Sequence, residues 1–411
     1  MKTNFNRALI PLILVNFVGI LGYTIVMPLM PYFVGRYGGG ALETGMLTAS
    51  YALCSFIAGP ILGQISDRYG RRPVLLISQL GTIIGFIIFA LSGALWMLFL
   101  GRIIDGITAG NQVVAQAYIG DVTKPQERTK TFAMMGASFG FGAIIGPVAG
   151  SLLANFGLFV PVWASVAISA LSLVLTFFLL PESLNKANVK PIIGGITGQF
   201  RAIGDMLTLP AVRNFYVLFA GMTLAMNLFI SSISLFTKLQ LKAPETEAGF
   251  GMAYFGLMII LLQLLVVPRI IKHLGELRMV GIGFISFLIG SIIMVFAYNW
   301  PTLLLAVTFI VYGMATLRSP LTSLISQAAG ALKQGVAMGS TQSLDSIGQF
   351  IAPLIGGILI EHFNPGTPSI ISALVCVGAL VYFALNRGVL RSTTAAAKNM
   401  STPAEVAMAG H

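Results

Sequence analysis

Long apolar runs follow one another along almost the whole chain, and they limit what this sequence can fold into. About 20 mostly apolar residues suffice to cross the hydrocarbon core of a bilayer. With 56% hydrophobic and only 9% charged residues, the runs are typical of a polytopic membrane protein and argue against a soluble enzyme. We interpret the apolar start as a first span, because its run is too long for a cleaved signal peptide. The twelve expected spans are 8–32, 43–63, 73–92, 95–118, 131–153, 158–180, 213–235, 248–268, 279–297, 302–325, 337–360 and 368–386.

The 24 Lys and Arg residues are spread unevenly over the two sides of the expected membrane. If the N-terminus is cytoplasmic, only Arg36, Lys238 and Lys242 fall outside, whereas most other basic residues lie in cytoplasmic segments. This is the positive-inside bias. It explains the net charge of +11 by topology, so we expect no nucleic-acid partner. We expect a multi-pass protein in contact with the lipid bilayer and with both termini in the cytoplasm.

A long polar segment divides the twelve spans into two groups of six. We expect an N-terminal six-helix bundle at 1–180, a cytoplasmic linker at 181–212 and a C-terminal six-helix bundle at 213–388. The tail at 389–411 has almost no large apolar residues, and we expect it to be disordered.

The two halves repeat one another. DGITAG and IIGPVAGSLL in the first half recur as YGMATL and FIAPLIGGIL in the second, at almost the same separation. The loop SDRYGRRPV between spans 2 and 3 has a diverged copy, IKHLGELRMV, between spans 8 and 9. Gly275 there takes the place of Gly70, but Lys272 and Glu276 replace an aspartate and an arginine. Two six-helix halves are the plan of secondary transporters that bind substrate at mid-membrane.

The loop between spans 2 and 3, GQISDRYGRRPVLL at 63–76, gathers charge in a chain that has little. Glycine at its start lets span 2 end against a neighbour, and Gly70 permits a turn with positive φ. Asp67 can cap the next segment or bind a guanidinium. A plain solvated loop needs the arginines but neither the aspartate nor the glycines. The candidate residues of this loop are Gly63, Asp67, Gly70, Arg71 and Arg72.

Four charged residues are expected inside the membrane, where an unpaired charge costs roughly 3 kcal/mol or more. Arg102 and Asp105 lie three residues apart in span 4, on one helix face. Arg318 in span 10 and Asp345 in span 11 belong to the second half. Such charges persist where they pair or take part in function, and a static structural ion pair is one alternative.

Span 5 carries FGFGAIIGPVAGS, with Gly142, Gly146, Pro147 and Gly150. Glycines four residues apart make a flat face that another helix can approach closely. Proline removes a backbone hydrogen bond and bends the helix. Ordinary close helix packing is the alternative interpretation of this pattern.

On these motifs the sequence resembles the major facilitator superfamily across residues 8–388, and within it the twelve-span drug:proton antiporters that are similar to tetracycline-resistance exporters. The resemblance implies an all-α integral protein of a bacterial inner membrane, built from two pseudo-symmetric six-helix bundles. It also implies that Asp121 joins the loop residues in a latch of the outward-facing state, that Arg102 takes part in proton coupling, and that the span 5 motif marks exporters. Gly19 stands where tetracycline exporters usually have an aspartate, and Ala133 and Ser151 replace glycines of the fullest span 5 pattern.

Asp105 and Asp345 are the candidate proton carriers, because they are the only acids predicted deep in the membrane. A carrier must lie where burial favours its protonated form and a cation favours its ionised form. Asp345 is the preferred carrier, because Arg102 beside Asp105 should hold that carboxylate ionised. Arg102 and Arg318 are the expected countercharges. Polar and aromatic residues of the spans are candidates for the substrate cavity or for bonds between helices. They are Asn16, Tyr23, Asn111, Gln112, Gln116, Asn227, Tyr254, Gln263, Gln327, Gln342 and Gln349.

The function expected from these features is export of small amphiphilic molecules in exchange for protons, by alternating access. Transport of one physiological solute, such as a sugar, an amino-acid derivative or a siderophore, is an alternative on the same fold. A receptor or channel is a third, although a channel does not need repeated halves with two similar loops. The sequence has no G-x-x-x-x-G-K-[ST] loop for ATP, and Cys54 and Cys376 have no metal-ligand spacing. We therefore expect a monomeric transporter without cofactor, metal or enzymatic activity, whose partners are a small-molecule substrate and protons.

Overall fold

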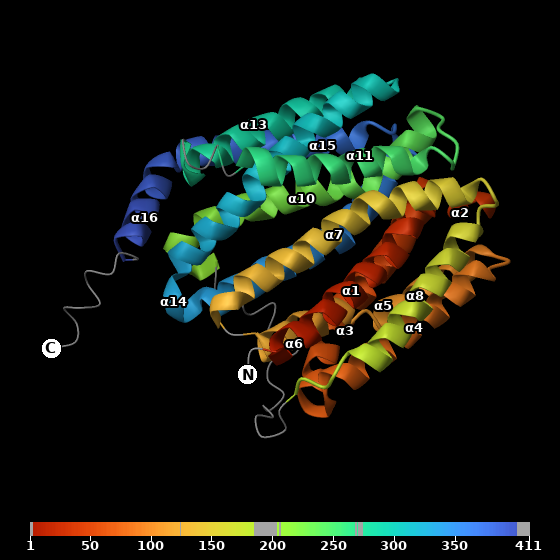
Figure 1. Cartoon of the computed structure of the whole chain (residues 1–411). Coiled ribbons are helices and arrows are strands. Elements are labelled where there is room, and N and C mark those ends of the chain that lie inside the picture. The colour runs from red at the N-terminus through yellow and green to blue at the C-terminus, as the bar shows by residue number, and fades with distance from the viewer. Residues whose placement is uncertain are drawn as a thin grey trace. The chain divides into compact units, whose positions relative to one another are not determined.

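The computed structural model describes residues 3–123, 125–184, 204, 207–267, 269 and 274–400, and the regular structure in these ranges is helical (Figure 1). Helices are the expected outcome for apolar spans, because a backbone in lipid must satisfy its own hydrogen bonds. Most of the expected linker, at 185–203, and the end of the tail, at 401–411, lie outside the described residues.

The helices of the first half can be followed from red to yellow in Figure 1. They are α1 (Thr3–Val26), the short helices η1 (Met27–Leu29) and α2 (Met30–Arg36), α3 (Ala41–Tyr69), α4 (Arg71–Ala90), α5 (Leu95–Ile107), α6 (Asn111–Val122), α7 (Pro125–Ala154) and α8 (Val160–Leu179).

The helices of the second half run from green to blue in Figure 1. They are α10 (Pro210–Gln240), α11 (Ala248–Leu261), a π-helical stretch η3 (Leu262–Val266), α13 (Glu276–Val295), α14 (Trp300–His362), α15 (Thr367–Leu385) and α16 (Arg387–Met400).

Within the described ranges, nine helices are long and apolar enough to cross a membrane. Two shorter apolar helices, Gly140–Ala154 and Ala248–Leu261, fall on the expected spans 5 and 8. The expected span 4 is divided into α5 and α6 around Gly110. The all-α, multi-pass architecture is confirmed, while the count of twelve spans stays a prediction.

Helix α14 contains both expected spans 10 and 11, yet it is not one straight rod. Arg318 and Asp345 are 27 residues apart in sequence, which is about 40 Å along a straight helix. Their side chains nevertheless form an ion pair of 2.6 Å. The chain must therefore turn back on itself between Arg318 and Asp345.

The chain forms two compact units that cross the division of the sequence into halves. Unit 1 comprises Met1–Ile196, Ile230–Leu257 and Gln349–Pro365, and unit 2 comprises Thr197–Phe229, Met258–Gly348 and Gly366–His411. Unit 1 thus includes parts of α10, α11 and α14 together with the first six spans.

The two larger buried apolar clusters among the described residues of unit 1 lie toward opposite ends of its helices. The first contains Phe33 and Phe89, whose rings meet edge to face with centroids 5.0 Å apart. The second contains Val114, Tyr118 and Ile119 of α6. Because span 4 contributes Leu98 to the first cluster and Val114 to the second, the charged part of α5 lies between them along the chain.

Glycines allow the same helix pairing in both halves. Between α4 and α5, a side chain at Gly85 would meet the backbone oxygen of Gly101. Between α13 and α14, a side chain at Gly313 would meet the backbone oxygen of Gly283. Spans 3 and 4 therefore approach as closely as spans 9 and 10, as expected for glycine-mediated contacts.

Helix α16 occupies a segment that we expected to be disordered from residue 389. Alanine has the highest helix propensity, and the run of three alanines at 395–397 favours a helix even without large apolar residues.

Candidate functional site

The loop between α3 and α4 builds a charged cluster around Arg71. Gly70 reverses the chain with a φ of +112°, which favours glycine, and Arg71 follows as the first residue of α4. Its buried guanidinium binds Asp67 Oδ1 at 2.5 Å through Nη2 and Asp121 Oδ2 at 3.0 Å through Nε. Nη1 donates to Ser66 Oγ at 2.6 Å. Three of the candidate latch residues thus meet in one place, and their role as a latch stays a prediction.

The two remaining loop candidates lie at the edges of this cluster. A side chain at Gly63 would come within 3.1 Å of Val113 Cγ1, so glycine allows α3 to pass close to α6. Arg72 points toward α8, where its guanidinium lies 5.3 Å from the centre of the Phe177 ring and donates to the Phe177 carbonyl oxygen.

The sequence analysis missed Glu182, which completes the loop cluster from the end of span 6. Its carboxylate accepts hydrogen bonds from the backbone N–H groups of Arg71 at 2.9 Å and Arg72 at 3.1 Å. A carboxylate at a helix N-terminus satisfies unpaired donors and the positive end of the helix dipole. The neighbouring Ser183 donates its hydroxyl to Asp121 at 3.2 Å. The signal in the sequence was the polar triplet PES directly after an apolar run.

The loop between the expected spans 8 and 9 repeats this arrangement with different charges. Gly275 has a φ of +75°, and Glu276 follows as the first residue of α13. Its carboxylate accepts hydrogen bonds from Ser323 Oγ at 2.7 Å and Gln327 Nε2 at 3.2 Å. In the register that aligns Pro147 with Pro353, Gln327 stands where Asp121 stands in the first half. Gln327, a candidate cavity residue, is thus the partner of this second loop.

Arg102 lies in an aromatic cage formed within unit 1. Its Nη1 bonds Asp105 Oδ2 at 3.1 Å, and both side chains are almost fully buried. The guanidinium lies 4.1 Å from the centre of the Tyr51 ring on α3 and 5.6 Å from that of Tyr23 on α1. These two rings stack on each other with centroids 5.6 Å apart. Cation–π contacts and an ion pair therefore hold this charge away from lipid, and Tyr51 was missed in the sequence.

Arg318 and Asp345 form the corresponding pair within unit 2, across the two sections of α14. Arg318 Nη2 lies 2.6 Å from Asp345 Oδ2, and Thr223 of α10 donates to the other carboxylate oxygen at 3.1 Å. The arginine side chain is 48% exposed, whereas that of the aspartate is only 4% exposed. The sequence suggested both residues but could not show that they are partners, and Thr223 was missed.

Helix α7 presents its glycine motif to α1. A side chain at Gly146 would clash with Thr24, and one at Gly150 would clash with the backbone oxygen of Ile25. Thr24 also donates its hydroxyl to the Gly142 carbonyl oxygen at 2.9 Å. The glycines are thus required for the close approach of spans 5 and 1.

The next face of α7 contacts α11, also within unit 1. A side chain at Gly249 would clash with the carbonyl oxygen of Pro147, and the Gly249 N–H donates to Ser151 Oγ at 2.6 Å. Ser151 replaces a glycine of the fullest motif, and its hydroxyl therefore accepts a hydrogen bond that a glycine at this position could not accept.

Two further charged contacts in unit 1 connect segments far apart in the sequence. Glu361, near the end of α14, accepts hydrogen bonds from the N–H groups of Ala41 at 2.8 Å and Leu42 at 3.4 Å, where α3 begins. Lys238, near the end of α10, donates to the Pro31 carbonyl oxygen of α2 at 2.5 Å. The sequence analysis assigned no role to either residue.

The candidate cavity residues differ in their surroundings. Asn227 is buried and donates to the Thr223 carbonyl oxygen at 2.9 Å, so it supports the Asp345 site. The side-chain oxygen Oδ1 of Asn111 is buried without a hydrogen-bond partner among the described residues. The side chain of Gln112 lies outside what the structure describes. The half-buried candidates are Asn16, Tyr23 and Tyr254, and the exposed ones are Gln116, Gln263, Gln342 and Gln349.

The apolar helices and repeated halves define a multi-pass integral membrane protein with the architecture of a secondary transporter. The sequence model of the Major Facilitator Superfamily matches residues 12–241 and 215–406. The match covers nearly the whole chain, and the protein belongs to this superfamily.

Curated relatives match most of this chain and most of their own length. The class E tetracycline resistance protein of Escherichia coli is 33% identical over 86% of this chain and 88% of its own. The class C protein of the same organism is 32% identical over 85% and 89%. Multidrug resistance protein 2 of Bacillus subtilis (strain 168) is 27% identical over 89% and 91%.

Solved structures of transporters share the fold. The human organic anion transporter MFSD10 (TETRAN) superposes with a TM-score of 0.69 at 20% identity, over 92% of this chain and 99% of its own. The nucleoside transporter NupG superposes with a TM-score of 0.75 at 16% identity, also over 92% and 99%.

Proposed function

We propose that this protein exports small amphiphilic molecules across a bacterial inner membrane in exchange for protons, with both termini in the cytoplasm. The names of the tetracycline and multidrug resistance relatives support export. The uneven distribution of basic residues supports the orientation. The expected partners are a small-molecule substrate, protons and the lipid bilayer, and the expected state is a monomer.

The observation that carries the proposal is the buried carboxylate of Asp345 beside a half-exposed arginine. A proton that binds Asp345 removes the charge that holds Arg318, so the guanidinium becomes free to move. Loss of the proton restores the ion pair and the bond from Thr223. A carboxylate that exchanges a proton for a movable cation is the chemistry that proton coupling requires.

Arg102 and Asp105 serve in this proposal as a fixed countercharge in the first half. Both groups are buried, and two aromatic rings cover the guanidinium. Because a proton on Asp105 would leave Arg102 buried without its partner, this pair resists exchange. It fixes the local charge, while the Asp345 pair changes with each cycle.

Alternating access requires contacts that form and break at both ends of the helices. We assign the cytoplasmic latch to Asp67, Arg71 and Asp121. We assign contacts on the other side to Glu361 and Lys238, which bond to backbone groups of α3 and α2. Hydrogen bonds to helix ends can be exchanged for water at modest net free energy, so such contacts can bias an equilibrium without locking it.

Gly19 bears on which substrates are exported. A side chain there would meet no atom within 4 Å, so the absence of an aspartate reflects no lack of space. We expect tetracycline to be a poor substrate unless Gly19→Asp supplies the missing acid.

The test is a substrate screen with purified protein in vesicles that have an acidic lumen. Amphiphilic cations, zwitterions and anions are offered outside, with tetracycline as one arm, and luminal pH is followed by an enclosed dye. Antiport predicts that a substrate accumulates while the lumen becomes more alkaline. Substrate that moves in the same direction as protons would contradict export by exchange.

A further inference from the structure

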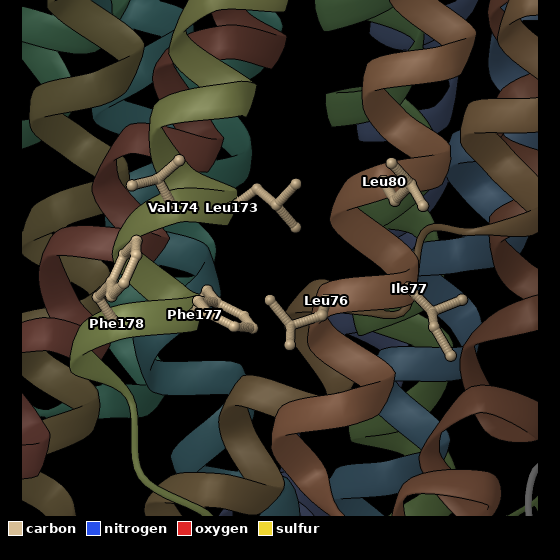
Figure 2. Close-up of a pocket in the computed structure, with 7 residues that line it drawn as sticks. All are labelled: Leu76, Ile77, Leu80, Leu173, Val174, Phe177 and Phe178. Carbon is tan, nitrogen blue, oxygen red and sulfur yellow. The ribbon is translucent and has the colours of Figure 1, made fainter.

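An apolar groove lies between α4 and α8 on the surface of unit 1. It has a volume of about 320 Å³ and is lined by Leu76, Ile77, Leu80, Leu173, Val174, Phe177 and Phe178. Figure 2 shows Leu173 and Phe177 of α8 pointing toward Leu76 and Leu80 of α4. Several of these side chains are strongly exposed, including Ile77 at 61% and Phe178 at 75%. In a membrane protein such a surface faces acyl chains.

Buried hydrogen bonds hold the two helices together behind the groove. Gln79 Nε2 of α4 donates to Ser172 Oγ at 3.1 Å and to Thr176 Oγ1 at 2.8 Å, both on α8. These three residues are buried, whereas the groove residues of the same helices are half-buried or exposed. The groove is therefore a fixed feature of the α4 and α8 pair rather than a gap between mobile elements.

A cation lies beside one of the residues that line the groove. Phe177 lines the groove, and the Arg72 guanidinium lies 5.3 Å from the centre of its ring and donates to its carbonyl oxygen. Arg72 Nε is buried and has no hydrogen-bond partner among the described residues. Within the same ranges, Arg72 also forms no ion pair with a carboxylate, in contrast to Arg71.

Glu182, which bonds to the Arg72 backbone, is engaged elsewhere. Glu182 accepts hydrogen bonds from the backbone N–H groups of Arg71, Arg72, Ser183 and Leu184. Its negative charge is thus directed at the N-terminus of α4, and no carboxylate among the described residues forms an ion pair with the Arg72 guanidinium beside the groove.

We propose that this groove binds one anionic phospholipid, with an acyl chain along α4 and α8 and the phosphate at Arg72. Apolar contact alone gives no selectivity, because lipid tails are as apolar as the groove. Selectivity must come from charge, and a single arginine near a membrane surface is worth about a fivefold preference for an anionic lipid. A zwitterionic lipid fits the same groove without that preference.

The test uses tryptophan fluorescence quenched by lipids with brominated acyl chains, which report the lipid and not free phosphate. Trp96, Trp163 and Trp300 are first replaced by Phe, and Ile77→Trp then places one reporter in the groove. Ile84→Trp, two turns along α4 and outside the groove residues, is the matched control. Brominated phosphatidylglycerol is compared with brominated phosphatidylcholine at each position, so differences in depth cancel.

Arg72→Gln and Arg68→Gln separate the site from diffuse surface charge, since each removes one positive charge. Arg68 is exposed and lies over Tyr69. We expect about a fivefold preference for the anionic lipid at residue 77, kept in Arg68→Gln and lost in Arg72→Gln, with no preference at residue 84. Native mass spectrometry of the chain with its own tryptophans should show one phosphatidylglycerol fewer in Arg72→Gln.

Three outcomes would overturn the proposal. The first is equal quenching by both lipids at residue 77 with Arg72 in place. The second is an equal loss of preference in Arg68→Gln and Arg72→Gln, which would indicate surface potential alone. The third is protection of residue 77 from both lipids while residue 84 is quenched, which would mean that protein covers the groove.

Discussion

Two buried carboxylates, those of Asp105 and Asp345, are held in different ways. Asp105 pairs with an arginine three residues away on the same helix, and that arginine is buried between tyrosine rings. Asp345 pairs across two helix sections with Arg318, whose side chain is half exposed. The first pair moves as one body with α5, whereas the second can separate when either section of α14 shifts. An ion pair within one helix is therefore suited to stay formed, whereas an ion pair between two helix sections is suited to break and re-form.

The loops of the two halves show a similar contrast. Arg71 is held by two carboxylates, whereas Glu276 at the corresponding place is held by neutral donors, Ser323 and Gln327. The first loop depends on charge and the second on hydrogen bonds alone. Substitutions that remove one charge at a time test both contrasts.

The largest effect is expected from Asp345→Asn. The amide keeps the size of the side chain but cannot carry a proton, so uphill, pH-driven export should fall to the level of vesicles without protein. Substrate binding and downhill exchange should survive, measured in the same vesicles without a pH gradient. Undiminished pH-driven accumulation would return the role of carrier to Asp105.

Arg102→Met should be the most destabilising of these changes, because it leaves Asp105 buried without a countercharge. Breaking a buried pair typically costs about 3–5 kcal/mol, measured here by thermal unfolding in detergent. Arg102→Met with Asp105→Leu should recover most of that stability, since an apolar pair replaces the ions. If the double variant also exported substrate normally against a gradient, the pair would be structural only.

Gly150→Ala and Gly356→Ala compare equivalent helix contacts in the two halves. A side chain at Gly150 would clash with the backbone oxygen of Ile25, which cannot rotate away, whereas one at Gly356 would meet Ser232 Oγ, which can. Overpacking costs about 1–3 kcal/mol, so Gly150→Ala should lower the stability and Gly356→Ala should change it little. Equal losses of stability in the two variants would show that span 7 packs against span 11 as tightly as span 1 packs against span 5.

Arg71→Gln and Glu276→Gln compare the two loops directly. Arg71→Gln leaves Asp67 and Asp121 without their countercharge, and we expect turnover to fall about tenfold, equivalent to ~1.4 kcal/mol, with normal insertion. Glu276→Gln keeps an amide oxygen for Ser323, so turnover should remain within about twofold, as for most substitutions at neutral contacts. Wild-type turnover in Arg71→Gln would remove the latch from the mechanism.

Thr223→Val should have a smaller effect on transport than Arg71→Gln. It removes one hydrogen bond from Asp345, worth ~1 kcal/mol, and should slow pH-driven export by a factor of about five without uncoupling it. The ratio of protons to substrate, measured by paired fluxes, should stay constant. A changed ratio would mean that Thr223 belongs to the proton path itself.

Features that depend on hydropathy or local spacing were predictable from the sequence. The apolar runs indicated the helices, because lipid forces the backbone to bond internally. The three-residue spacing of Arg102 and Asp105 predicted their ion pair. The resemblance to the superfamily predicted that Asp121 lies with the residues of the loop between spans 2 and 3.

Contacts across helices were not predictable, since they depend on how helices rotate and pack. Glu182, Tyr51 and Thr223 each reach their partner from another helix or from the end of one, and no spacing in the sequence records this. The partnership of Arg318 with Asp345 depends on the fold-back of α14, which hydropathy suggests without giving its register.

The inverted loop charge also makes the two halves chemically distinct while they assemble. A duplicated membrane protein risks pairing an element with the partner that belongs to its twin. Placing the Glu276 end of α13 where the Arg71 end of α4 lies would remove the countercharge and bring a further carboxylate toward Asp67 and Asp121. Like-charge contact of this kind costs several kcal/mol, so the charge difference between the two loops disfavours such a mispaired arrangement.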